Sequence, residues 1–259
     1  VPVAGEQCAI ARKREGRKMS GARVLVVEHQ ENAGLGLFTA GLVDGGAELE
    51  IVGPDVGKPV PETLDGFDAL IVLGGAMGPT EDDTSPWLPA TRNLLVSGIE
   101  QQIPTLGICL GAQLMVSAAG GHVRTMPEGP EIGLNTVEFS SAASGDPLFD
   151  GLSGSSVPVV QWHYLEADQL PAQAELLASS AACSNQAFRV GPAAWGVQFH
   201  PEALGQTALE WVEEDEQSLA ELGLDGDTVV TDVREAEPQL SAVWSEIASR
   251  FAGIAASRG

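Results

Sequence analysis

Apolar residues in the first half of the chain form short runs that alternate with segments of helical periodicity. Four runs have the length and β-branched content of buried strands, at residues 23–28, 47–52, 67–73 and 103–108. Helical spacing is found over residues 34–43 and 87–101, and a third helix is predicted from the end of the fourth strand to residue 119. Strands that alternate with helices predict right-handed βαβ units and a mostly parallel sheet that is covered on both faces.

The pattern changes after residue 120, where short apolar runs are separated by Gly, Pro and Ser turns. These runs predict an antiparallel or mixed extension of the sheet, with strands at residues 122–124, 132–139, 157–160, 175–178, 186–190 and 194–199. Two helices are predicted to follow, at residues 208–221 and 239–256, and the second has an apolar stripe at i, i+3, i+4 spacing. We therefore expect one α/β domain over residues 21–205, with residues 206–259 as a helical extension packed on it.

Residues 1–20 differ from the rest because they have no apolar periodicity and hold five of the 13 basic residues. They lack the apolar h-region of a secretory signal. The segment is predicted to be a disordered basic tail, a remnant of cloning or an over-extended start, with Met19 as a plausible first residue. Without it the chain has 8 basic and 34 acidic residues, which gives a net charge of −26.

The acidic balance excludes some classes of function. A net charge of −23 for the whole chain argues against binding to nucleic acid or an anionic membrane, both of which need a basic surface. No apolar run approaches the ~20 residues of a transmembrane helix, and we expect a cytoplasmic protein. The three cysteines, Cys8, Cys109 and Cys183, are too few and too scattered for a disulfide framework or a zinc site, and no metal or cofactor is expected.

Residues 104–121 contain the most informative local pattern. An apolar run ends in Gly107-Ile108-Cys109-Leu110-Gly111, and a helix-prone run begins at once. A nucleophile that is flanked by small residues between a strand and a helix is typical of a nucleophile elbow. The positive end of the following helix favours a thiolate, which is the reactive form of cysteine. The pattern predicts that Cys109 is a nucleophile.

Two further motifs also stand at the ends of predicted strands. One is Leu73-Gly-Gly-Ala-Met-Gly-Pro79, and the other is Trp195-Gly-Val-Gln-Phe-His-Pro-Glu202. In an open α/β sheet, functional loops gather at the carboxyl ends of the strands. We expect Cys109 to attack a carbonyl carbon, His200 to exchange the proton, and Glu202 to orient the imidazole and stabilise its charged form.

The glycine pair after the third strand has a predicted role beside the nucleophile. Backbone N–H groups at Gly74-Gly75, with that of Leu110, can form an oxyanion hole. Gln113, one helical turn after Cys109, can reach a polar group of a substrate. Each feature also has a simpler interpretation: a buried thiol, a plain turn, a structural histidine. Their joint occurrence in this order favours a catalytic site.

These motifs resemble those of the class I glutamine amidotransferases, the Cys-His-Glu or triad type. The resemblance covers residues 23–205 and is strongest at residues 107–113 and 196–202. Residues 178–188, together with Trp162-His163, are most similar to the stand-alone GMP-synthase-like branch.

The resemblance implies a three-layer α/β/α, flavodoxin-like fold and a glutaminase reaction. In that reaction the triad Cys109, His200 and Glu202 converts the side-chain amide of L-glutamine into a γ-glutamyl thioester and ammonia, and then into glutamate. It also implies an oxyanion hole from the backbone of Gly75 and Leu110. Substrate contacts are implied for Gly74 and Gln113, and for His163 and Tyr164 near the site.

The acceptor of the ammonia is not implied. The Ser-Gly-Gly-x-Asp-Ser signature of an ATP-pyrophosphatase domain is absent from the sequence, so we do not expect this chain to activate an acceptor with ATP. It would pass ammonia to a separate synthetase subunit or hydrolyse a γ-glutamyl amide alone. The alternatives are a γ-glutamyl peptidase that acts on glutathione-like substrates, a reactive-cysteine redox sensor or chaperone-like protein, and a glutaminase that is inactive without its partner.

Overall fold

A computed structural model describes residues 21–258, and the predicted basic tail at residues 1–20 lies outside the described residues. The central sheet has nine strands in the order β2-β1-β3-β4-β11-β10-β9-β6-β7. The strand bounds are β1 Arg23–Val27, β2 Glu48–Val52, β3 Ala69–Val72, β4 Thr105–Ile108, β6 Glu131–Phe139, β7 Ser156–His163, β9 Ala174–Ser179, β10 Ala187–Val190 and β11 Ala194–Val197.

The sheet has a parallel half and an antiparallel half. Strands β2, β1, β3, β4 and β11 are parallel, whereas β11, β10, β9, β6 and β7 pair antiparallel. Strand β11 lies directly beside β4, with Val197 opposite Ile108. Because the two strands are parallel, the residues that follow β11 meet the residues that follow β4 at the same edge of the sheet. This pairing brings the elbow and the His200 motif together.

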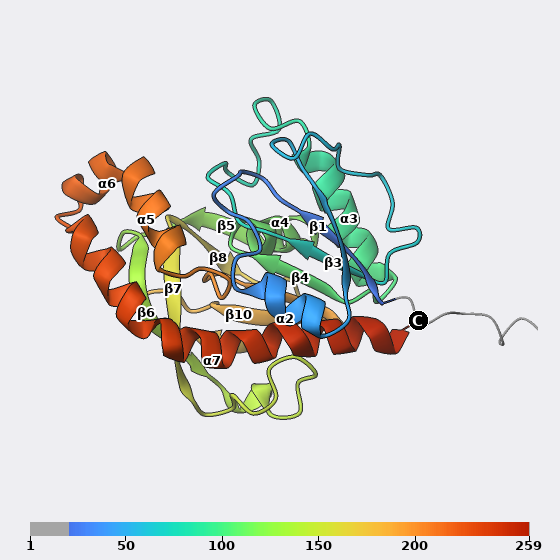
Figure 1. Cartoon of the computed structure of the whole chain (residues 1–259). Coiled ribbons are helices and arrows are strands. Elements are labelled where there is room, and N and C mark those ends of the chain that lie inside the picture. Colours follow the sequence, from blue (N-terminus) through green and yellow to red (C-terminus); the bar gives the residue numbers. More distant parts are fainter. Residues whose placement is uncertain (1–20, 259) are drawn as a thin grey trace, which may run out of the picture.

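Helices cover both faces of the sheet, as the predicted α/β/α fold requires. Strand β1 alternates between the faces: Leu25 and Val27 pack with helices α3 (Leu88–Glu100) and α4 (Leu110–Ala118). Val24 and Val26 pack on the other face, which is covered by α2 (Phe38–Asp44) and α7 (Gly226–Arg258). The class and the layering of the fold therefore agree with the sequence-based prediction (Figure 1).

Several predicted boundaries were wrong. The helix expected over residues 208–221 is divided at Asp215 into α5 (Gly205–Glu214) and α6 (Glu216–Glu221). The last helix begins at Gly226 instead of residue 239, because its apolar stripe continues through Val229, Val230 and Val233 and Pro238 is accommodated inside it. Buried residues on both sides of Pro238, Ala236 and Leu240, keep the helix continuous.

Two other local predictions differ from the structure. The helix expected from residue 34 begins at Phe38, since the glycine-containing segment before it forms a loop. Strand β8 (Leu165–Gln169) was not predicted, and it pairs with β5 (His122–Thr125) in a separate two-stranded sheet. Its sequence, Leu-Glu-Ala-Asp-Gln, lacks the β-branched residues that mark a strand.

The helices after residue 205 pack on the same core as the sheet. Helix α7 contacts α2, α5, β6 and β7, and its Trp244 indole N–H donates to the carbonyl of Pro158 at 3.0 Å. Within residues 21–258, no helix is both long enough and apolar enough to cross a membrane, and this includes α7.

Candidate active site

Cys109 lies on a strained turn between β4 and α4. Its backbone has φ 49° and ψ −104°, a left-handed conformation that non-glycine residues seldom adopt. The flanking glycines are needed for space. A Cβ on Gly107 would lie 2.7 Å from the backbone of Gly111, and one on Gly111 would collide with the carbonyl of Val72. The elbow is therefore packed tightly against β3, and the Cys109 residue is 6% exposed.

His200 and Glu202 form a buried pair just after β11. His200 Nδ1 lies 2.7 Å from Glu202 Oε1, and both side chains are less than 5% exposed. The backbone holds both residues from two directions: His200 N–H donates to the carbonyl of Val160, and Leu37 N–H donates to that of Glu202. The loop before α2 thus packs directly on the Glu202 backbone, where a Cβ on Gly36 would not fit.

The charge state of His200 follows from these neighbours. Burial by itself lowers the pKa of His200, but the negative charges of Glu202 and Cys109, with hydrogen bonds to both, outweigh it and raise the pKa to about 10. An imidazolium is therefore favoured at neutral pH. It is the proton-loaded form that a general acid needs.

Cys109, His200 and the glycine turn lie side by side. A Cβ added to Gly74 would lie 2.8 Å from the His200 ring and 3.6 Å from the Cys109 Cβ, so the absence of a side chain there makes room for the histidine. All three predicted triad residues are brought together, and Cys109 and His200 line one cavity of about 340 Å³. Gly75, Gln113, His163 and Tyr164 line the same cavity; Gly74 and Leu110 lie beside it.

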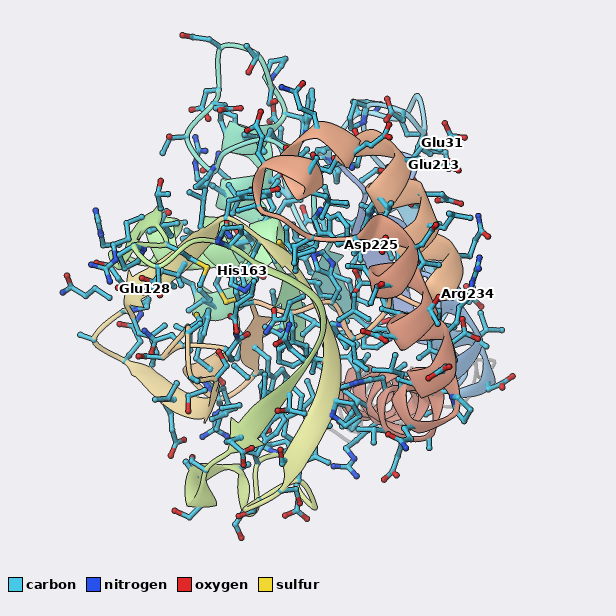
Figure 2. All side chains as sticks on the ribbon, turned by 90° about the vertical axis from the view of Figure 1, so that its left-hand side faces the viewer. Glu31, Glu128, His163, Glu213, Asp225 and Arg234 are labelled. Atoms are coloured by element: carbon cyan, nitrogen blue, oxygen red, sulfur yellow. The ribbon has the colours of Figure 1, made fainter. Side chains whose placement is uncertain are left out.

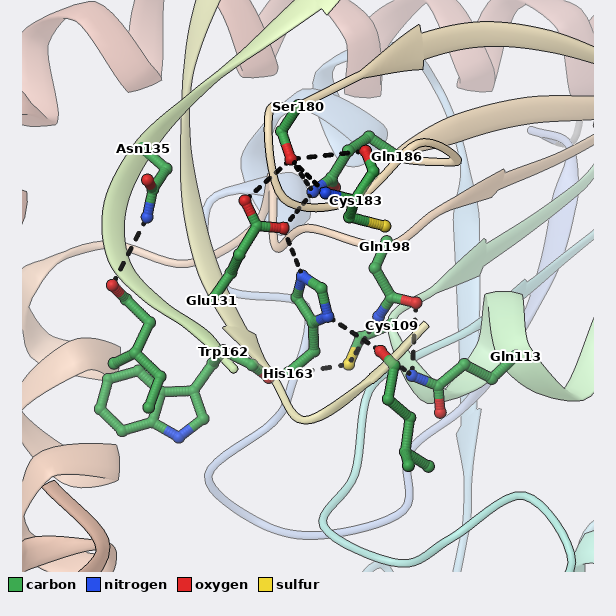
Figure 3. A network of polar contacts seen from close by, with 12 residues as sticks. Cys109, Gln113, Glu131, Asn135, Trp162, His163, Ser180, Cys183, Gln186 and Gln198 are labelled. Carbon is green, nitrogen blue, oxygen red and sulfur yellow. Dashed lines mark hydrogen bonds and ion pairs between the residues drawn. The ribbon is translucent and has the colours of Figure 1, made fainter. Parts of the chain in front are cut away.

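A chain of hydrogen-bonded amide side chains connects Cys109 to Gln198 and Gln113 (Figure 3). Gln198 Nε2 donates to Cys109 Sγ at 3.7 Å, and Gln113 Nε2 donates to Gln198 Oε1 at 3.3 Å and to the carbonyl of Leu165 at 3.4 Å. Cys109 Sγ also lies 3.9 Å from the carbonyl oxygen of Trp162. Gln113 is thus buried and already bonded to the protein.

His163, which lines the cavity, belongs to a second polar network. Its Nδ1 donates to the carbonyl of Leu165 at 2.9 Å, and its Nε2 lies 3.2 Å from Glu131 Oε2. Glu131 also accepts from Gln186 Nε2 at 2.6 Å and from Ser180 Oγ at 2.8 Å (Figure 3). These bonds hold the turn between β7 and β8, whose backbone faces Cys109.

Sequence reasoning missed several residues at this site. Gln198 could have been identified, because it stands two residues before His200 on extended backbone and so shares its side. Glu131 and Trp211 carry no local signal, and Trp162 was indicated only by the family resemblance. Trp211 comes from α5, and its ring packs edge-on against His200 with centroids 4.6 Å apart.

Comparison with known proteins places the chain in a family. The family model described as "Glutamine amidotransferase class-I" matches residues 37–215. The chain belongs to the class-I glutamine amidotransferase family. The match reaches past residue 205 and includes α5, which is consistent with the contact between Trp211 and His200.

Individual relatives agree with this assignment. The glutamine amidotransferase-like protein YfeJ of Salmonella typhimurium is 30% identical over 77% of this chain and 83% of its own length. The glutamine-hydrolyzing GMP synthase subunit of Saccharolobus solfataricus is 35% identical over 61% of this chain and 77% of its own length. The predicted resemblance to the GMP-synthase-like branch is confirmed.

Other matches extend the comparison to a solved structure and to a peptidase. A crystal structure of a glutamine amidotransferase from Thermotoga maritima has a TM-score of 0.78 and 28% identity, and it covers 90% of this chain and 98% of that chain. Gamma-glutamyl peptidase 3 of Arabidopsis thaliana is 26% identical over 60% of this chain and 62% of its own length.

Proposed function

We propose that this protein hydrolyses γ-glutamyl amides, with L-glutamine as the simplest substrate, through a Cys109–His200–Glu202 triad. The observation that supports this function best is the buried His200–Glu202 pair, 2.7 Å between Nδ1 and Oε1, beside a cysteine on a strained elbow. A structural thiol needs neither the strain nor a charged histidine.

In the proposed first step, the Cys109 thiolate attacks the side-chain carbonyl carbon of the substrate. Negative charge develops on the carbonyl oxygen, and the N–H groups of Gly75 and Leu110 are the candidate donors to it. Among residues 21–258, neither N–H group has a hydrogen-bond acceptor. His200, held protonated by Glu202, then gives its proton to the departing nitrogen, and the C–N bond breaks.

The second step hydrolyses the thioester. The departing nitrogen leaves as ammonia or an amine, and neutral His200 takes a proton from water, whose oxygen attacks the γ-glutamyl carbon. The C–S bond breaks, glutamate leaves, and the proton on His200 restores the starting state. Residues 162–165, which include Tyr164, line the cavity together with Gln113. They are candidate contacts for the glutamyl part of the substrate, and Gly74 lies beside the expected position of the reacting carbon.

Two versions of this function differ in whether the released ammonia is used by a second protein. The relationship to the glutamine-hydrolyzing GMP synthase subunit supports transfer to a separate synthetase subunit. The relationship to a gamma-glutamyl peptidase supports hydrolysis of a larger γ-glutamyl amide by this chain alone. A redox-sensing role for Cys109 has less support, because it would not need the His200–Glu202 pair.

The test measures glutamate and ammonia release from glutamine and from γ-glutamyl amides, with Cys109→Ser as the variant and Cys183→Ser as the control. Cys183 is a suitable control because it is buried, and burial raises the pKa of its thiol to about 12. We expect loss of activity and of covalent labelling by a glutamine-mimicking electrophile only in Cys109→Ser. Full activity of that variant would overturn the assignment.

A further inference from the structure

One wall of the active-site cavity is built from aromatic rings and carboxylates. Trp162, Tyr164 and Trp211 line the cavity here together with Glu214 and Asp215 at the end of α5, and Glu81 lines the cavity as well. Trp162 and Trp211 pack against each other with ring centroids 5.5 Å apart. Aromatic faces with nearby carboxylates are the surroundings that an organic ammonium group prefers.

The carboxylates on this wall are not neutralised by the protein. Glu214 accepts a hydrogen bond from Asn32 Nδ2 at 2.7 Å, and Asp215 accepts one from the Trp162 indole at 2.9 Å. Both donors are uncharged, and none of the residues that line the cavity is lysine or arginine. The wall therefore keeps its negative charge. The pKa of Tyr164 is raised, mainly by burial and to a smaller extent by the nearby negative charge of Asp215.

The position of His200 shows which end of the substrate meets this wall. The departing nitrogen must come within hydrogen-bond reach of His200, because His200 is its proposed proton donor. Trp211 packs on the His200 ring, and Glu214 and Asp215 follow Trp211 at the end of α5. The group attached to the departing nitrogen is thus directed toward α5.

We propose that the preferred substrates are γ-glutamyl amides of diamines or polyamines, whose second ammonium group binds among Trp162, Trp211, Glu214 and Asp215. This inference rests on the proposed function and names its substrate class. The reaction breaks the γ-glutamyl C–N bond: His200 supplies the proton to the departing amine, and water supplies the hydroxyl to the glutamyl thioester.

The test compares two amides of matched length, γ-glutamyl-putrescine and γ-glutamyl-butylamine, which differ by one terminal ammonium group. Glutamine serves as the reference substrate. We expect kcat/KM to be about tenfold higher for the charged amide, with the difference mainly in KM. Added salt should reduce this preference, because the wall opens to solvent.

The variants Glu214→Gln and Asp215→Asn remove charge but keep an oxygen that can accept from Asn32 or Trp162. Each should lower the ratio of kcat/KM for the charged amide to that for the butylamide about threefold. Glu213→Gln is the matched control. Glu213 is the neighbouring residue on α5, exposed at the same edge as Glu31, and does not line the cavity (Figure 2).

Equal kcat/KM for the two amides, or hydrolysis of glutamine alone, would overturn this inference and leave the proposed function intact. Loss of preference in Glu213→Gln as large as in Glu214→Gln would show a general charge effect and would also overturn it. Absence of hydrolysis of every amide, glutamine included, would reject the proposed function itself.

Discussion

Two buried histidine–carboxylate pairs lie at the same cavity. They differ in the partners of the histidine ring nitrogens. In the pair His163–Glu131, both ring nitrogens are occupied: Nδ1 donates to a backbone carbonyl and Nε2 faces the carboxylate. In the pair His200–Glu202, only Nδ1 is used by the carboxylate, and the rest of the ring faces Cys109 and the cavity. One histidine is held in place, and the other can exchange a proton.

The carboxylates differ in the same way. Glu131 lies within hydrogen-bond distance of three side chains, His163, Ser180 and Gln186, so its position is defined by a network. Glu202 has one side-chain partner, His200, and its Oε2 atom is buried without a partner among residues 21–258. The charge of Glu202 is therefore directed to His200 alone. A histidine and a glutamate in contact do not by themselves make an acid–base pair; the second ring nitrogen must also face the reacting group, as it does only in His200.

The largest effect is expected from exchanging the two histidines for asparagine in turn. His200→Asn removes the proposed proton carrier and should lower kcat/KM for glutamine by about 10³-fold or more. His163→Asn keeps a donor near the carbonyl of Leu165 and should cost about tenfold, mainly in KM. Steady-state kinetics of both variants test this, and equal losses would contradict the division of roles.

Replacing Glu202 by Gln should have a smaller effect on rate and a clear effect on pH dependence. His200 is protonated below a pKa of about 10 while Glu202 is charged. Without that charge, burial lowers the pKa of His200, so the protonated form disappears at a lower pH. We expect kcat/KM to fall about 10²-fold at neutral pH and its alkaline limit to move downward. Glu131→Gln, the control, should leave that limit in place.

His29 completes the comparison as a buried histidine without a carboxylate, and its replacement should have the smallest effect at neutral pH. Its Nδ1 accepts from the Trp87 indole at 2.9 Å, and burial lowers its pKa to about 4. As pH falls, His29 in the unfolded chain, with an ordinary pKa of ~6.5, takes up a proton at a higher pH than His29 in the folded chain does. The folded state therefore loses stability as pH falls from ~6.5 to ~4.

The variant His29→Gln, which keeps an acceptor for Trp87, should remove this part of the pH dependence, at most about 3 kcal/mol. Chemical unfolding at pH 7 and at pH 4.5 measures the difference between the variant and the parent chain. A parallel loss of stability in both proteins as pH falls would show that His29 is not the titrating group.

The elbow, the His-Pro-Glu segment and the alternation of strands and helices were readable from the sequence because each is a local pattern. Glycine spacing around Cys109 reflects steric limits on a single turn, and His200 and Glu202 are two residues apart on extended backbone. These features predicted the family, the α/β/α fold and the three candidate residues that the structure brings together.

The cavity wall and the second histidine pair were decided only by the tertiary structure. Glu131 and His163 meet because β6 pairs with β7, and Trp211 reaches His200 because α5 packs beside the end of β11. Hydrophobic periodicity indicates which face of an element is buried, but it does not encode which element will cover that face. The sequence therefore predicted a nucleophile and its proton carrier, whereas the packing of α5 against these residues formed the acidic, aromatic surface that we propose selects the substrate.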